Sequence, residues 1–135
     1  MNITLRDFRD SDGDLLENIL IENDQFEFPD VENKASMKRV ADNPSSVFLV
    51  AEWDGKVAGF AKGFYDGSRA QLQLVSVAKQ YQRFGVGKTL IQAVQSNLKK
   101  MGAPTVAVVN REETAEYWLK SGYSPLPVNV MVKRI

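Results

Sequence analysis

The chain has 135 residues, and its contents of 44% hydrophobic and 25% charged residues are those of an ordinary globular domain. Lys and Arg together number 17, as do Asp and Glu, so the zero net charge gives no general attraction to nucleic acid or to an anionic membrane. The absence of Cys and His excludes disulfides, zinc sites built from these residues, Cys nucleophiles, His bases and Ser-His-Asp triads. We therefore expect no metal, and any acyl chemistry has to use carboxylates, Tyr, Lys, water or backbone dipoles.

Length and hydropathy favour one domain in the cytoplasm. No apolar run approaches the roughly 18 residues of a membrane span, and the first residues lack the charged and apolar regions of a signal peptide. A chain of this length forms one core by the usual size of domains. We expect a single domain over residues 1–135, with no nucleic-acid or membrane partner.

The N-terminal third predicts a strand and two helices. A strand alternates its side chains with period two, whereas a helix places apolar residues three and four positions apart. Asp10, Ser11 and Asp12 are N-cap candidates for the first helix, and Asn43-Pro44 ends the second. The apolar residues that define these elements are Ile3, Leu5 and Phe8 in the strand, Leu15, Leu16, Ile19 and Leu20 in the first helix, and Met37, Val40 and Ala41 in the second.

Residues 46–78 predict an antiparallel meander of strands, joined at the Asp54-Gly55 turn and at a second turn over 65–68. Its last strand, over 71–77, changes phase: Leu74 follows the parity of the preceding apolar residue, whereas Val75 and Val77 have the other parity. This slip predicts a β-bulge near residues 74–75, which would redirect side chains and free backbone groups. A strand buried on both faces is the alternative.

The second half predicts a helix over 85–101, a strand over 105–109, a helix over 112–120 and a closing strand over 128–132. The strand, helix and strand from 71 to 109 imply a right-handed parallel crossover. The expected fold class is therefore mixed α/β, with a mostly antiparallel sheet that contains a central parallel β-α-β crossover. An exposed edge over 128–132 would allow a homodimer.

The most distinctive segment, over 82–89, joins a predicted strand to the clearest helix and contains Gly85 and Gly87. The first amides of a helix are unpaired donors at the positive end of its dipole, and glycines let a phosphate approach the backbone. Gly87-Lys88-Thr89 resembles the end of a P-loop, but that motif needs a glycine where Gln82 stands. A phosphate-binding turn is predicted, and a turn that only packs the helix on the strand is the alternative.

Several segments in order resemble the GNAT acetyltransferase superfamily, and the resemblance covers nearly the whole chain. Gln82-x-x-Gly85-x-Gly87 is similar to the superfamily signature between a strand and a helix. The other similar segments are Arg6 with residues 10–12, residues 50–59 and residues 117–123, while residues 63–67 resemble a subgroup of very small bacterial members. The resemblance implies a single N-acetyltransferase domain over residues 1–135 that uses acetyl-CoA.

The resemblance also implies roles for named residues. Backbone amides over 83–88 would hold the CoA pyrophosphate, the strand edge at the bulge would pair with the pantetheine arm, and a backbone N–H near Val75 would donate to the thioester carbonyl. Asn110 lies one residue before the family's usual asparagine position and is a further cofactor candidate. The cofactor-binding set is Leu74, Val75, Val77, Gln82, Arg83, Phe84, Gly85, Val86, Gly87, Lys88, Thr89 and Asn110.

Two positions depart from the family pattern. Trp118 replaces the Tyr that is often the general acid, with Tyr117 about 100° away around the helix, and Gln71 stands where histone-type members have a catalytic Glu. The candidate catalytic residues are Tyr117 as acid and Glu27, in the aromatic and acidic loop over 24–30, as a base acting through water. Their structural alternatives are a packing aromatic and a solvated loop carboxylate.

The missing base favours an acceptor amine of low pKa. At pH 7, deprotonating an amine of pKa about 10.4 costs roughly 4.6 kcal/mol, against about 1 to 1.4 kcal/mol for an α-amine. We expect the acceptor to be a primary amine of a small molecule or peptide that attacks directly in a ternary complex, since orientation alone contributes up to about 7–11 kcal/mol. A non-catalytic acyl-CoA sensor and an interaction module of the same fold are the alternatives.

Overall fold

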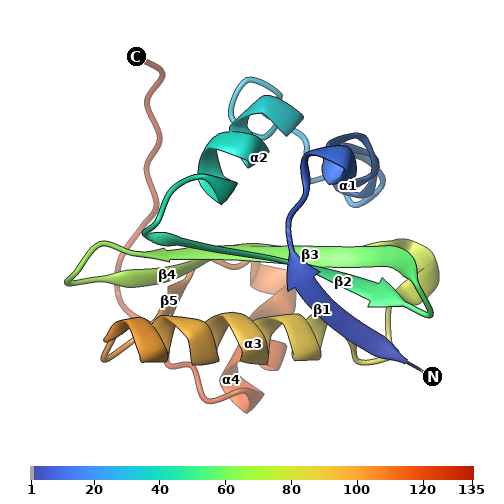
Figure 1. Ribbon diagram of the computed structural model, residues 1–135. Helices are drawn as coiled ribbons and strands as arrows, with labels where there is room; N and C mark the ends of the chain where they lie inside the picture. The colour runs from blue at the N-terminus through green and yellow to red at the C-terminus, as the bar shows by residue number, and fades with distance from the viewer. Residues whose placement is uncertain (1) are drawn as a thin grey trace.

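A mixed five-stranded sheet with helices on both faces makes up the computed structural model, which describes residues 2–135. The elements are β1 (Ile3–Asp7), α1 (Gly13–Glu22), α2 (Lys34–Ala41), β2 (Ser46–Trp53), β3 (Lys56–Tyr65), β4 (Ala70–Val77), α3 (Val86–Met101), β5 (Ala107–Val108) and α4 (Ala115–Lys120). Short 3-10 turns cover Asp10–Asp12, Lys79–Tyr81 and Glu112–Thr114. The strands follow in the order β1-β2-β3-β4-β5, with α1 and α2 above the sheet and α3 and α4 below it (Figure 1).

The mixed α/β fold class, the antiparallel meander and the parallel crossover are confirmed. β1 to β4 pair antiparallel, whereas β4 and β5, joined through α3, pair parallel. Because no further strand follows β5 in this sheet, the crossover forms its edge and not its centre. The strand expected over 105–109 is shorter, at Ala107–Val108. Over residues 2–135, no helix is long and apolar enough to cross a membrane.

The closing strand expected over residues 128–132 is wrong, because these residues form irregular chain after α4. Val128, Val130 and Val132 alternate with polar neighbours but are 73%, 65% and 81% exposed. Alternation predicts a strand only where a sheet offers a face to cover it. The tail instead runs past the sheet towards the side of α1 and α2 (Figure 1). There Arg134 donates two hydrogen bonds to the carboxylate of Asp30, in the loop between α1 and α2, at 2.7 and 2.9 Å.

Each face of the sheet carries its own hydrophobic core, which explains the two helix layers. α3 has an apolar stripe that packs below the sheet, whereas α1 and α2 cover aromatic residues of β2 and β3 above it. The lower core includes Val47, Leu49, Leu72, Val86, Leu90, Val94 and Leu98, and the upper core includes Leu16, Leu20, Met37, Phe48, Val50 and Phe60. The sheet is therefore buried on both sides along β2 and β3.

β4 changes faces at a β-bulge. Its register pairs Leu74 with Lys62 but Leu72 with the next residue of β3, so Gln73 is the extra residue of β4. Leu72 packs into the lower core and Leu74 against the upper one. The predicted bulge is confirmed, but the phase slip comes before Leu74 and not after it, because Leu74 shares its face with Ser76.

Arg6 joins β1 to the start of α1 and to β2. Its guanidinium donates to both carboxylate oxygens of Asp12 at 2.8 Å and to Glu52 at 2.8 Å. Asp12 is only 3% exposed and also accepts a hydrogen bond from the Arg9 backbone N–H at 2.8 Å. A nearly buried carboxylate with these partners holds the N-terminal end of α1 on the sheet.

Candidate active site

The start of α3 presents unpaired backbone amides. In the turn that precedes α3, Arg83 and Gly85 have positive φ angles of 71° and 89°. The first hydrogen bond of the helix runs from Thr89 N–H to the Gly85 carbonyl at 3.0 Å, and no side chain in residues 2–135 caps this end. The N–H groups of residues 86–88 are therefore free to bind an anion at the positive end of the helix dipole.

Aromatic packing and one buried side chain hold this turn in place. The centroid of the Trp53 ring lies 5.4 Å from that of the Phe84 ring and 6.1 Å from that of the Tyr81 ring. Val86 is 1% exposed in the lower core, so only its backbone faces a ligand. A Cβ on Gly87 would lie 3.6 Å from a methyl group of Val77, which places the free amides directly against the end of β4.

Beyond the bulge, β4 has an open edge. β5 pairs with only two residues of β4, and both come before the bulge. On the other side, Ala78 N–H donates to the Ala58 carbonyl at 2.8 Å, and backbone groups along an antiparallel strand point alternately towards and away from the partner. Val75 and Val77 therefore direct their N–H and C=O groups away from β3, into the gap beside β5.

Side-chain amides already bind the outward carbonyls of this edge. Gln25 Nε2 donates to the Val75 carbonyl at 3.1 Å, while Asn23 Nδ2 and Gln82 Nε2 donate to the Val77 carbonyl at 2.8 and 2.9 Å. Gln82, expected from the signature to contact cofactor, thus has a partner within the protein. The arrangement ties the end of α1 to the strand edge and to the phosphate-binding turn.

The Ser76 side chain links the side-chain amides of Asn23 and Gln25. Its hydroxyl is 2% exposed, accepts a hydrogen bond from Asn23 Nδ2 at 2.9 Å and donates to Gln25 Oε1 at 2.5 Å. Sequence reasoning missed Asn23, Gln25 and Ser76, since polar residues in a loop and on a strand carry no local signal of a contact across more than 50 positions.

The gap between β4 and β5 opens into a cleft of about 420 Å³. Its walls are the loop between α1 and α2, the bulged part of β4, and the segment from β5 to α4. The lining residues are Asp24, Gln25, Glu27, Phe28, Val31, Glu32, Leu72, Gln73, Leu74, Val75, Val108, Val109, Asn110, Arg111, Thr114 and Trp118. The bulge thus separates the two parallel strands and creates this cleft.

The predicted residues divide between the cleft and its approach. Glu27, Leu74, Val75 and Asn110 line the cleft, whereas Val77 and residues 82–89 lie along the approach to it from α3. Tyr117 is not among the lining residues: it is 42% exposed and makes an edge-on contact with Trp118, which does line the cleft.

Carboxylates outnumber cations in the cleft. Asp24, Glu27 and Glu32 line it together with one guanidinium, that of Arg111. Arg111 donates to the backbone carbonyl of Asp24 at 2.6 Å, so it spans the cleft from β5 to the end of α1. The Asn110 side chain donates to the Arg111 carbonyl at 2.9 Å. This charge balance favours a cationic ligand in the cleft.

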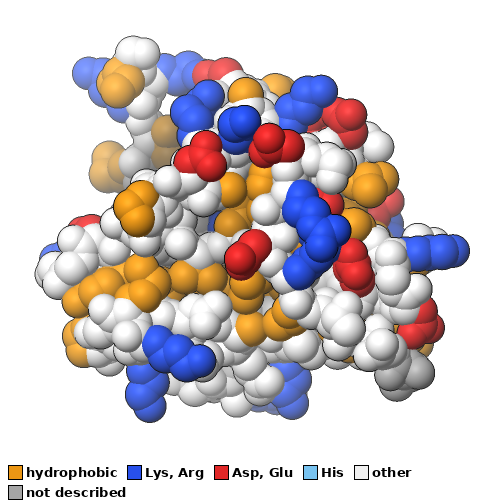
Figure 2. Space-filling view, in the orientation of Figure 1, with side chains coloured by type: hydrophobic (Ala, Val, Ile, Leu, Met, Phe, Trp, Pro, Cys, Tyr) orange, Lys and Arg blue, Asp and Glu red, His pale blue; other side chains and the backbone are white. Residues whose placement is uncertain are grey.

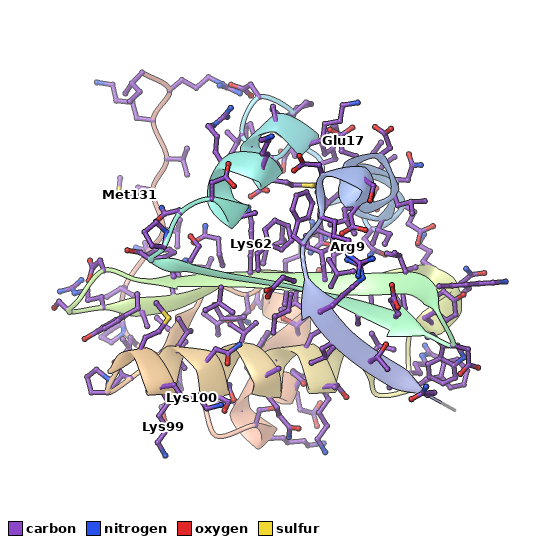
Figure 3. The ribbon with its side chains drawn as sticks, in the orientation of Figure 1. Arg9, Glu17, Lys62, Lys99, Lys100 and Met131 are labelled. Carbon is purple, nitrogen blue, oxygen red and sulfur yellow. The ribbon has the colours of Figure 1, made fainter. Side chains whose placement is uncertain are left out.

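A larger hollow of about 680 Å³ lies at the opposite edge of the sheet, between the ends of α2 and α3. Figure 2 shows apolar side chains on this face, and the hollow is lined by Phe8, Val47 and Met101 among others. It faces the C-terminal end of α3, where the helix dipole is negative and disfavours phosphate. Lys100 lines the hollow, whereas Lys99 points away from the sheet (Figure 3). Because the dipole at this helix end disfavours phosphate, the cleft at β4 and β5 is the better candidate site.

A split parallel edge next to an uncapped helix N-terminus defines the mixed α/β architecture of this protein. The chain belongs to the acetyltransferase (GNAT) domain family, whose family model matches residues 16–134. Among curated relatives, it is 28% identical over 85 residues to an acetyltransferase of Photorhabdus laumondii, covering 63% of this chain and 59% of that protein. It is 29% identical over 77 residues to an acetyltransferase of Pectobacterium atrosepticum, covering 57% and 55%. The match thus spans little more than half of either relative.

Solved structures share the fold at low identity. AAC(6')-Iy in complex with a CoA bisubstrate analogue has a TM-score of 0.80 at 17% identity, covering 100% of this chain and 99% of that one. PaiA N-acetyltransferase from Thermoplasma acidophilum in complex with coenzyme A has a TM-score of 0.68 at 18% identity, covering 90% and 88%. An aminoglycoside acetyltransferase from a soil metagenome, in complex with sisomicin, has a TM-score of 0.75 at 16% identity, covering 98% and 97%.

Proposed function

We propose that this protein is an acetyl-CoA-dependent N-acetyltransferase, which moves an acetyl group to a primary amine by direct attack in a ternary complex. One observation carries the proposal: the free amides of residues 86–88 lie against the end of β4 at Val77, and the outward backbone of the same strand reaches the cleft at Val75. The family membership of the chain and its curated acetyltransferase relatives support it.

The residues present fit the parts of acetyl-CoA. Free amides at the start of α3 suit a diphosphate, and the exposed side chains of Arg83 and Lys88 add positive charge beside them. At the open edge, the N–H groups of Val75 and Val77 and the second lone pair of the Val75 carbonyl can pair with the amides of a pantetheine arm. The Val77 carbonyl already accepts hydrogen bonds from Asn23 and Gln82. When bound, acetyl-CoA supplies an acyl carbon activated as a thioester.

In this proposal, backbone dipoles provide most of the electrostatic stabilisation of the transition state. The Val75 N–H faces the gap, where it can donate to the thioester oxygen as negative charge develops on it. A thiol of pKa about 8.5 leaves readily as thiolate near neutral pH, which reduces the need for a general acid. Tyr117 remains a proposal for that acid, although its position outside the cleft lining gives it no direct path.

The acceptor amine enters at the end of the cleft formed by the loop between α1 and α2. Glu27 lines this end and, in our proposal, accepts the proton of the attacking amine through a water molecule. An acceptor of low pKa, part of which is already neutral, needs less from such a base. A homodimer stays a prediction, but residues 128–132 do not form the edge strand on which it was based.

Release of CoA thiol from acetyl-CoA, measured with a mixed panel of primary amines, tests the proposal. We expect amine-dependent release that is lost in Gly87→Glu. Binding of acetyl-CoA without release on any amine would favour the sensor alternative instead. Absence of both binding and release would favour the interaction module.

Glu27→Gln is expected to lower kcat by about 10²-fold, the lower end of what a positioned base contributes. The effect should be largest at low pH, where more of the acceptor is protonated. Glu116→Gln is the matched control, because Glu116 is an 81% exposed carboxylate paired with Lys120 on α4. An unchanged kcat in Glu27→Gln across the pH range would end the role of Glu27.

A further inference from the structure

Lys62 is a charged residue inside the apolar layer between the sheet and α1 and α2. It is 5% exposed on β3, where its cross-strand neighbours are Phe48 and Leu74. Figure 3 shows it rising from β3 towards α2. Its ammonium donates to Glu32 Oε2 at 2.8 Å. Because an apolar residue at such a position often stabilises a fold as well or better, this pair points to a role beyond stability.

The pair lies next to the bulge of β4. Lys62 is directly opposite Leu74, and paired residues in antiparallel strands have Cα atoms about 4.5–5.5 Å apart. The peptide that joins Leu74 to Val75 carries the N–H proposed for the thioester oxygen. Lys62 therefore holds Glu32 near the part of β4 where we propose that the thioester carbonyl binds.

Glu32 has one carboxylate oxygen left for a ligand. Lys62 binds Oε2, whereas Oε1 has no hydrogen-bond partner within residues 2–135. The side chain is 20% exposed and lines the cleft together with Asp24 and Glu27. A carboxylate held from behind by a buried ammonium keeps its orientation and presents its free oxygen to the cleft.

We propose that Glu32, positioned by Lys62, binds a second ammonium group of the acceptor, so that the preferred acceptors are small diamines and polyamines. The inference rests on the proposed acetyl transfer at this cleft. An attacking amine has to be neutral, so it gives no lasting ion pair, whereas a second amine keeps its proton throughout. The charge of that second amine also lowers the pKa of the attacking amine, which agrees with the expected acceptor of low pKa. The attacking nitrogen forms the amide bond and loses its proton through water to Glu27, the thiolate leaves, and the charge at Glu32 is unchanged.

Steady-state kinetics with diaminobutane and with butylamine, which share a carbon chain, test this in the full chain. We expect wild type to prefer the diamine in kcat/KM by at least about 10-fold, as a charge-assisted hydrogen bond contributes, mainly through KM. Glu32→Gln should abolish this preference, and Glu116→Gln should retain it. An equal preference for the diamine in Glu32→Gln and wild type would overturn the proposal. A new preference of Glu32→Gln for acceptors that carry a carboxylate would also overturn it, because the freed Lys62 ammonium, and not the loss of a bond to Glu32, would then explain the change.

Calorimetric binding of diaminobutane to the CoA-loaded protein separates this inference from the proposed function. Weaker binding by about 10-fold in Glu32→Gln, with the affinity for CoA unchanged, would support the inference even without turnover. Lys62→Met should lower the diamine preference, and Lys62→Arg should restore it because it keeps the cation. A merely structural Lys62 would instead change the unfolding midpoint and leave the ratio of the two acceptors as in wild type, which contradicts the positioning role.

Discussion

Acetyl-CoA at about 100 times its dissociation constant is expected to raise the unfolding midpoint of the wild-type protein by roughly 5–10 °C, because binding contributes about 2.7 kcal/mol. Gly87→Glu should abolish this shift and leave the protein folded. A Cβ at Gly87 meets only a Val77 methyl group, at 3.6 Å, so the first side-chain atom fits without a clash. Its carboxylate, however, lies among the amides proposed for the diphosphate and repels it.

The variant should be no less stable than wild type without ligand, since a carboxylate in the first turn of a helix interacts favourably with the dipole. Gln92→Glu is the matched control: it makes the same charge change at an exposed position of the same helix, and its shift should equal that of wild type. A shift that persists in Gly87→Glu would place the diphosphate elsewhere. No shift in wild type at millimolar ligand would overturn the cofactor proposal.

Arg6→Met is expected to destabilise the protein by about 3 kcal/mol, the lower end for breaking a buried ion pair, because it leaves the Asp12 carboxylate almost buried with one remaining donor. The midpoint should fall by roughly 10 °C in a domain of this size. Lys38→Met is the control, since it removes a similar pair to Asp10 whose side chains are 60% and 73% exposed. Such exposed pairs contribute about 0–1 kcal/mol, so equal losses in the two variants would contradict the role given to Arg6.

The effect of Arg6→Met should also depend on pH. Burial by itself raises the pKa of Asp12, but the hydrogen bonds from Arg6 and from the Arg9 backbone outweigh it and lower the pKa below its usual range. The stability from this group is therefore complete above the unfolded pKa of about 3.9 and is lost as the pH falls through the lower folded value. Without Arg6 that stability is missing at neutral pH, so wild type and variant should converge in urea titrations at low pH.

Local patterns were sufficient for much of the fold. The apolar stripes over 13–22 and 86–101 follow from spacing on one helix face, and the meander follows from alternation and its turns. The glycine turn before α3 was also readable, because glycines at a strand-to-helix junction have a local physical meaning, whereas phosphate binding there stays a prediction. The bulge was placed a residue or two late, since parity alone did not reveal that Leu74 faces the upper core.

By itself, the sequence determined that the protein is mixed α/β, that it carries no Cys or His chemistry, and that a helix begins near Gly85. Only the tertiary structure decided the cleft, the amides on the β4 carbonyls and the pairing of Lys62 with Glu32 across 30 positions. It also left residues 128–132 without a sheet partner. The physical reason is that helix and turn signals depend on neighbours along the chain, whereas these contacts depend on strand register and on which segments the packed layers bring together.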